Sequence, residues 1–347
     1  MKLTAKQIFD LSLGAMTYEE KGGAVELCRF NEAQQALYME AAATGGRCGM
    51  TMIPGKIHCP AGIELRFRTD SPSLELDVEV KKGTGRTFFA IQVLVNGVSV
   101  GAIENHTAVQ VPPVYSHLPF EQGNFRQSFD LGAGEKEVRV LLPWSSRVLL
   151  HGVILADGAA LEAVKPAKKL LAYGDSITHG YDALWPSNCY PFQLADALGA
   201  EQHNRAIGGE IFFPELLEAD SLEAPDYITV AYGTNDWVKC TEAETRAACR
   251  AFYLTASRKY PNARIFALTP IWRQAWQQPG KGFGPWALSE QIIRESTADL
   301  PNVTVIDGLT LVPHEAACFA DDLVLHPNDA GFVHYGKNLA EAVKKAL

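Results

Sequence analysis

The spacing of apolar residues changes once along this 347-residue chain, and that change limits its fold more than any other feature. Up to about residue 165, short segments such as 63–68 and 74–80 are apolar at every second position. Period two sends alternate side chains to a core and to water, which is typical of antiparallel strands. Farther on, apolar runs alternate with helical patterns, which predicts βαβ units and a parallel sheet. We therefore expect two domains, residues 1–165 and residues 166–347.

The first domain is predicted to be a β-sandwich, because short strands follow one another closely with turn residues between them. Residues 89–95 and 98–100 flank Asn96-Gly97, a pair that favours a hairpin with a type I′ turn. Residues 138–142 and 148–155 continue the run of strands. An amphipathic helix is expected near residues 31–41, with Asn31 as its N-cap.

The second domain is predicted to be an α/β domain that begins after the polar segment 165–169. In chain order, the expected strands are 170–173, 227–232, 264–268 and 303–306, and the expected helices are 190–198, 242–259, 286–300 and 328–346. In such sheets, ligands bind outside the carboxyl ends of the strands. Polar clusters that follow the strands are therefore the candidate functional segments.

Charge and cysteine content exclude several classes of function. The chain has 31 Lys and Arg against 40 Asp and Glu, a net charge of −9, so neither nucleic acid nor an anionic membrane is an expected partner. Its seven cysteines include no CxxC pair, which argues against a disulfide framework and a cysteine-paired zinc site. The N-terminal residues have no long apolar run, so we expect a cytoplasmic location.

Four polar clusters lie at predicted strand ends. Residues 174–180 (GDSITHG) offer a serine on a strand-to-helix turn, or simply a helix N-cap. Residues 204–209 contain paired glycines, which allow close backbone approach or form a plain turn. Residues 232–237 contain an asparagine that could donate to an oxyanion or form an Asx-turn. Residues 321–331 contain a histidine with acids before it, either an oriented general base or a surface side chain.

Taken together, these clusters resemble those of the SGNH (GDSL-type) hydrolases: Gly-Asp-Ser at 174–176, a glycine near 208–209, Gly-Thr-Asn-Asp at 233–236 and His-Pro-Asn-Asp at 326–329. The resemblance covers residues 168–347 and implies a three-layer α/β/α domain. The preceding β-rich domain resembles the jelly-roll-like N-terminal module of two-domain carbohydrate esterases in the same superfamily.

The resemblance assigns the catalytic roles. It implies that Ser176 is the nucleophile and that His326 is its base, since a serine hydroxyl needs a base within hydrogen-bond reach. The oxyanion hole would be formed by the backbone N–H of Ser176, a backbone N–H of Gly209 (with Gly208 as the alternative) and the Asn235 amide.

One position departs from the family pattern. The family usually has its acid three residues before the histidine, where this chain has Leu323. A one-residue bulge would let Asp322 take that role. Otherwise a backbone carbonyl would orient His326, leaving a Ser–His dyad.

The resemblance implies a serine esterase that removes a short acyl group, with acetyl as the expected group, from a carbohydrate through an acyl-Ser176 intermediate. Trp237, Tyr181 and His179 are the expected substrate-binding residues, and no metal or other cofactor is expected. The expected partner is a small-molecule or oligosaccharide ester. A lysophospholipase or thioesterase of the same superfamily and a non-catalytic glycan-binding protein are the alternatives. The sequence leaves the oligomeric state open.

Overall fold

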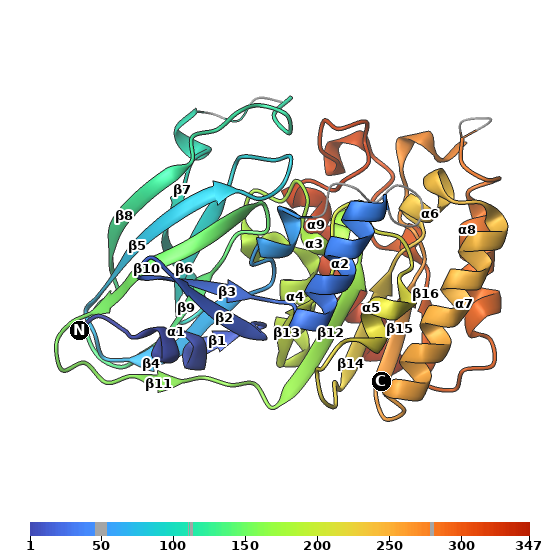
Figure 1. Ribbon diagram of the computed structural model, residues 1–347. Helices are drawn as coiled ribbons and strands as arrows, with labels where there is room; N and C mark the ends of the chain where they lie inside the picture. Colours follow the sequence, from blue (N-terminus) through green and yellow to red (C-terminus); the bar gives the residue numbers. More distant parts are fainter. Residues whose placement is uncertain (46–53, 110, 112–113, 278–280) are drawn as a thin grey trace.

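A computed structural model describes residues 1–45, 54–109, 111, 114–277 and 281–347. It contains antiparallel sheets built from the N-terminal half and one parallel sheet built from the C-terminal half, which lie side by side (Figure 1). The fold is therefore a β-sandwich joined to a three-layer α/β/α domain, as the sequence predicts.

Two antiparallel sheets face each other in the N-terminal half, and their inner faces share one apolar core. The first sheet has the order β2 (Thr17–Lys21), β3 (Ala24–Cys28), β10 (Ser146–Leu155), β5 (Ser73–Lys82), β8 (Gly123–Asp130). The second has the order β1 (Ser12–Leu13), β4 (Glu64–Thr69), β9 (Lys136–Leu141), β6 (Ala90–Val95), β7 (Val98–Glu104), and β11 (Glu162–Ala163) pairs with β4. The alternation of period two fills this core, because Leu74, Leu76 and Val78 of β5 are all fully buried.

The C-terminal half contains a five-stranded parallel sheet in the order β13 (Ala200–Asn204), β12 (Lys168–Gly174), β14 (Tyr227–Ala231), β15 (Arg264–Leu268), β16 (Val303–Ile306). Its strands are buried on both faces: Leu170 packs in the core with α4 and α9, whereas the next residue, Leu171, packs in the core with α7. The strand order reverses at β12, so a crevice is expected at the carboxyl ends of β12 and β14.

The helices are α1 (Ala5–Leu11), α2 (Glu32–Thr44), α3 (Ser176–His179), α4 (Tyr190–Leu198), α5 (Pro214–Glu218), α6 (Thr234–Lys239), α7 (Glu242–Lys259), α8 (Ala287–Thr297) and α9 (Asp329–Ala346). Short 3-10 segments are η2 (Lys56–His58), η3 (Thr107–Val109), η4 (Pro186–Asn188), η5 (Gln274–Gln277), η6 (Gly308–Thr310) and η7 (Ala316–Cys318).

The local predictions hold where the sequence signal is strong. Asn96 and Gly97 both have positive φ, 49° and 81°, and Val95 pairs with Val98 across them, as a two-residue type I′ turn requires. Asn31 caps α2 by accepting the Gln34 backbone N–H. Strand β13 was not predicted, because this edge strand has the polar sequence AEQHN, with no apolar run to indicate it.

Helix α2 departs from the division at residue 165, because it packs on the other half of the molecule. Tyr38 is fully buried in the core that contains α5 and α7, and its hydroxyl donates to Glu210. Asn31 also donates to the Ala219 carbonyl, just after α5. We still propose the domain boundary near residue 166, between β11 and β12. Helix α2 is then a segment of the first domain that packs on the second.

The cysteines differ from the sequence-based expectation at one position. Cys240 is disulfide-bonded, although the cysteine pattern argues against a disulfide framework. Five others are free and buried: Cys28, Cys59, Cys189, Cys249 and Cys318.

Candidate active site

The loop after β12 presents Ser176 at the first position of α3. Asp175 is the N-cap of this helix, and its carboxylate accepts the Ile177 N–H at 3.0 Å. Burial raises the pKa of Asp175 to about 6, so this carboxyl acts as a cap inside the protein and not as a solvated charge. Within the described part of the chain, the backbone N–H of Ser176 has no hydrogen-bond acceptor, which leaves it available to a ligand.

The loop before α9 places His326 against this serine. Its Nε2 lies 2.7 Å from the Ser176 Oγ, and both residues are at most 8% exposed. The His326 carbonyl accepts the Ala320 N–H at 2.8 Å, which fixes the loop. Because Nδ1 faces carboxylates, it must carry the ring proton, and Nε2 is left to accept the serine hydroxyl proton. The pair therefore has the geometry of a nucleophile and its general base.

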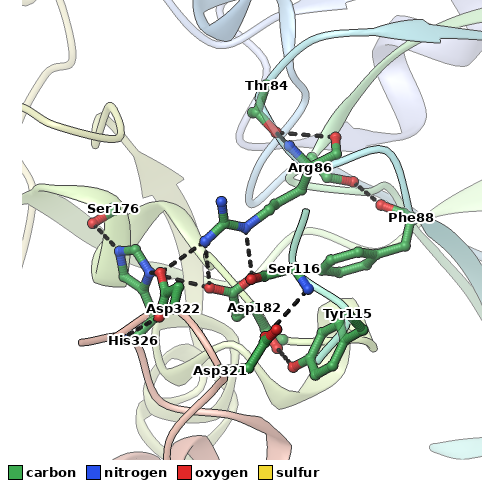
Figure 2. Close-up of polar contacts among 12 residues, drawn as sticks. Thr84, Arg86, Phe88, Tyr115, Ser116, Ser176, Asp182, Asp321, Asp322 and His326 are labelled. Atoms are coloured by element: carbon green, nitrogen blue, oxygen red, sulfur yellow. Dashed lines mark hydrogen bonds and ion pairs between the residues drawn. The ribbon is translucent and has the colours of Figure 1, made fainter. Parts of the chain in front are cut away.

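Two carboxylates face the His326 Nδ1, where the sequence predicted one or none (Figure 2). Asp322 forms a short hydrogen bond to Nδ1, and Asp182 Oδ2 lies 3.1 Å from the same atom. Asp322 reaches it from four residues upstream because Leu323 and Val324 both have left-handed backbones, with φ of 66° and 52°. These two residues form the bulge that the displaced spacing requires.

Arg86 from the β5–β6 loop binds both of these carboxylates. Its Nε and Nη2 donate to the two oxygens of Asp182 at 2.7 and 2.9 Å, and Nη2 also donates to Asp322 at 2.7 Å. Burial by itself raises the pKa of Asp182, but hydrogen bonds from Arg86 and His326 outweigh it and hold that pKa well below its usual range.

The pKa of His326 follows from the same contacts. Burial by itself lowers it, but hydrogen bonds to Asp182 and Asp322 outweigh burial and raise the pKa to about 9. The two acids thus make the imidazole a stronger base and stabilise the imidazolium that forms when it removes the serine proton.

The three N–H donors of the expected oxyanion hole are free of acceptors among the described residues. The Gly208 N–H is not among them, because it donates to His179 Nδ1 at 3.1 Å. The N–H of Gly209 has no acceptor among the described residues, and its φ of 89° suits a glycine. One Asn235 amide N–H donates to the Glu210 carbonyl at 3.0 Å, which orients the amide and leaves its second N–H free. The backbone thus favours Gly209 over Gly208 as the oxyanion donor.

The expected substrate-binding residues are all buried, and each has a packing role. Trp237 is 1% exposed, donates to the Gly284 carbonyl and packs edge-on against Trp286. His179 is 1% exposed and holds the Gly208 N–H. Tyr181, at 7% exposed, lies closest to the chemistry, with its ring centre 5.4 Å from that of His326. Of the three, we keep only Tyr181 as a candidate wall of the substrate site.

Sequence reasoning did not find Arg86 or Asp182. Asp182 follows Ser176 by six residues without a recognisable spacing, and it points at His326 only because its backbone is left-handed at φ 71°. Arg86 lies in a glycine-containing turn of the other domain, 90 residues before the nucleophile, and no pattern in the sequence connects the two.

The side chains of Asp182, Asp322 and His326 also bring one possible metal-ligand atom each within 4.8 Å of one another. Their inward oxygens already accept hydrogen bonds from Arg86, whose guanidinium supplies the positive charge that a cation would bring. We therefore interpret the cluster as a hydrogen-bonded network.

The parallel sheet, with a serine, a histidine and carboxylates at the carboxyl ends of its strands, defines the C-terminal half as a hydrolase domain. Residues 172–332, most of this domain, match the model of the GDSL-like lipase/acylhydrolase family. A search of curated proteins found no match.

Solved structures share the fold of both halves. The salicylyl-acyltransferase SsfX3 of a tetracycline biosynthetic pathway is 20% identical over 97% of this chain and 95% of its own, with a TM-score of 0.78. A putative GDSL-like lipase from Bacteroides ovatus is 19% identical over 99% and 97%, with a TM-score of 0.73. A carbohydrate esterase family 2 enzyme with a carbohydrate binding domain, from Corynascus thermopiles (Myceliophthora fergusii), is 18% identical over 82% and 94%, with a TM-score of 0.61.

Among the described helices, none combines the length and apolar character needed to cross a bilayer.

Proposed function

We propose that this protein is a serine esterase that hydrolyses short acyl esters, with acetyl esters of carbohydrates as the preferred class. The observation that carries the proposal is the Ser176 hydroxyl, 2.7 Å from a histidine whose other nitrogen faces two carboxylates. The proposal is supported by N–H groups of Ser176, Gly209 and Asn235 that have no acceptor among the described residues and could form the oxyanion hole.

In the proposed mechanism, the Ser176 oxygen attacks the ester carbonyl while His326 takes the hydroxyl proton. The free N–H donors stabilise the negative charge on the carbonyl oxygen. The histidine then gives its proton to the leaving alcohol, which leaves an acyl-Ser176. Water, deprotonated by His326, hydrolyses this ester and releases the acid.

A small acyl group is proposed because the nucleophile is buried and its surroundings are closely packed. Ser176 is only 8% exposed, and the Tyr181 ring packs so closely on Gly208 that an added Cβ there would lie 2.6 Å from it. The carbohydrate part of the proposal is supported by the shared fold of the carbohydrate esterase described above.

Acetate release from acetylated oligosaccharides, measured with wild type and Ser176→Ala, tests the proposal. We expect turnover by wild type only, and covalent labelling of Ser176 by a fluorophosphonate. Faster hydrolysis of p-nitrophenyl octanoate than of p-nitrophenyl acetate would favour a lysophospholipase or thioesterase instead. If Ser176 is not labelled and no ester is hydrolysed, the result would favour the non-catalytic glycan-binding protein.

A further inference from the structure

Arg86 is a buried side chain of the N-terminal domain that contacts the machinery of the C-terminal domain. It is 7% exposed and makes three N–H donations to carboxylates that face the His326 imidazole, at 2.7 to 2.9 Å (Figure 2). A planar guanidinium can donate to two carboxylates at once in a fixed geometry, which a lysine ammonium cannot do.

The arrangement around the imidazole requires such a donor. His326 offers a single N–H at Nδ1, and the oxygens of Asp182 and Asp322 both point at it. Two carboxylates this close repel one another, and Asp182 is completely buried. Arg86 supplies the hydrogen bonds that the second acceptor lacks, together with the positive charge that offsets the repulsion.

Other hydrogen bonds from the same domain contact both acidic loops, one at the backbone and one at a side chain. The Tyr115 hydroxyl donates to the Asp182 carbonyl at 3.1 Å. The Ser116 backbone N–H donates to the Asp321 carboxylate at 3.2 Å, one residue before the acid that contacts the histidine. Each acidic loop is therefore attached to the N-terminal domain both by Arg86 and by a second hydrogen bond.

We propose that Arg86 is a positioning residue of the catalytic base: it holds Asp182 and Asp322 as paired acceptors on the His326 imidazole, so the β-sandwich domain is part of the catalytic machinery. The inference rests on the proposed function only in taking His326 as a base. It goes beyond that function in making a residue of the N-terminal domain necessary for the chemistry.

A consequence is that Arg86 sets the pH at which the base becomes active. Among the described residues, the titratable groups that interact with His326 are Asp175, Tyr181, Asp182 and Asp322, and the cations Arg86 and Arg273 interact with Asp322. Loss of the Arg86 charge removes a cation that disfavours imidazolium, so the pKa of His326 should rise further. Since the base acts only when neutral, the acid limb of activity should move to higher pH.

The test compares Arg86→Gln with Arg139→Gln on full-length protein. Arg139 is a matched control, because it is 9% exposed, pairs with Glu64, and bridges the two halves through Asp196 at 2.8 Å. For Arg86→Gln we expect the acid limb of kcat/KM for p-nitrophenyl acetate to move up by about one pH unit. We also expect about a tenfold or larger loss of activity at pH 7. For Arg139→Gln we expect the acid limb of kcat/KM to stay at the wild-type pH, even if the substitution lowers the melting temperature.

Equal losses in both variants with the same pH midpoint would overturn the proposal, since Arg86 would then only join the two halves. If Arg86→Gln does not fold, Arg86→Lys tests the proposal instead, because lysine keeps the positive charge but cannot bridge both acids. We expect Arg86→Lys to lose at least about tenfold in kcat, with Arg139→Lys close to wild type. An Arg86→Lys enzyme with full kcat would be evidence against the proposal.

An NMR titration of the His326 ring separates this inference from the proposed function. If the wild type neither hydrolyses esters nor reacts with a fluorophosphonate, the proposed esterase function is wrong. The ring titration would still show whether Arg86 affects the pKa of His326. We expect the His326 midpoint to be higher in Arg86→Gln than in wild type and unchanged in Arg139→Gln. An identical midpoint in all three proteins would overturn the role of Arg86.

Discussion

At the scale of single residues, the unusual feature is a histidine with two acids on one nitrogen. One carboxylate suffices to hold an imidazole in the tautomer that a base needs. Here Asp322 approaches from the same loop as the histidine, and Asp182 from the loop that follows the nucleophile helix. Each can hold the ring when the other is removed, so we expect their roles to overlap.

Single and double substitutions test this overlap. We expect Asp182→Asn and Asp322→Asn each to lower kcat about tenfold to a hundredfold, the worth of one charged hydrogen bond. The double variant should lose about 10⁴-fold, because the wrong tautomer then becomes stable, and steady-state kinetics on p-nitrophenyl acetate measures all three. Asp299→Asn is the control, since Asp299 is an exposed carboxylate that pairs with Arg250 and not with the histidine. A double variant no worse than Asp322→Asn would show that Asp182 is dispensable.

The pH dependence of the wild type follows from the same residues. Hydrogen bonds to Asp182 and Asp322 raise the pKa of His326 to about 9, against burial, which lowers it. The imidazole must be neutral to accept the serine proton, so kcat/KM should rise with pH and level off only near that value. A kcat/KM profile from pH 6 to 10 checks this, and a plateau already reached at pH 7 would contradict it.

At the scale of elements, the loop between η7 and α9 compensates for the displaced acid. Leu323 and Val324 have left-handed backbones, a conformation that costs a side-chain-bearing residue about 1–2 kcal/mol. Leu323 is 83% exposed, so its side chain contributes little burial to offset that cost. The loop conformation that brings Asp322 to the imidazole therefore destabilises the folded protein.

Glycine at position 323 should relieve this strain. We expect Leu323→Gly to be more stable than Leu323→Ala by about 1 kcal/mol, because alanine loses the exposed side chain but keeps the Cβ that opposes positive φ. Thermal unfolding measures the difference, and kcat should stay near wild type in both. Equal melting temperatures would show that the loop is not strained at Leu323.

The strength of the apolar pattern decides which elements the sequence predicts. Strands β12 and β14 are buried on both faces and appear as continuous apolar runs, so their positions are predicted within a few residues. Edge strand β13 and strand β8 carry mostly polar residues, and neither was predicted. An edge strand depends on hydrogen bonds to a neighbour, which no local pattern records.

At the scale of the whole molecule, the two halves share a core. Trp144, Phe88 and Tyr115 of the N-terminal half pack in one apolar cluster with Tyr181 and Tyr190 of the C-terminal half. Trp144 also donates to the Ala183 carbonyl at 2.8 Å and lies 4.8 Å from the Tyr181 ring. Neither half can bury these residues alone, so the two should unfold together.

Calorimetry of the full chain should show one cooperative transition. We expect Trp144→Ala to lower the free energy of unfolding by about 3–5 kcal/mol, as for other buried aromatic residues, and to lower the melting temperature of the whole protein. Trp276, which lies on the η5 segment outside this cluster, is the comparison. We expect Trp276→Ala to lower the free energy of unfolding by less than Trp144→Ala does. Two separate heat-absorption peaks in the wild type would show that the halves fold independently.

The sequence by itself determined the two-part architecture, the strands of the parallel sheet, and Ser176, His326 and Asn235 as the candidate machinery. These features are local, because they depend on apolar period and on short motifs at strand ends. Only the tertiary structure decided that Gly209 and not Gly208 offers a free N–H, that Asp182 joins Asp322, and that Arg86 binds both. Those contacts join residues up to 236 positions apart, and their geometry is set by how the two halves pack together.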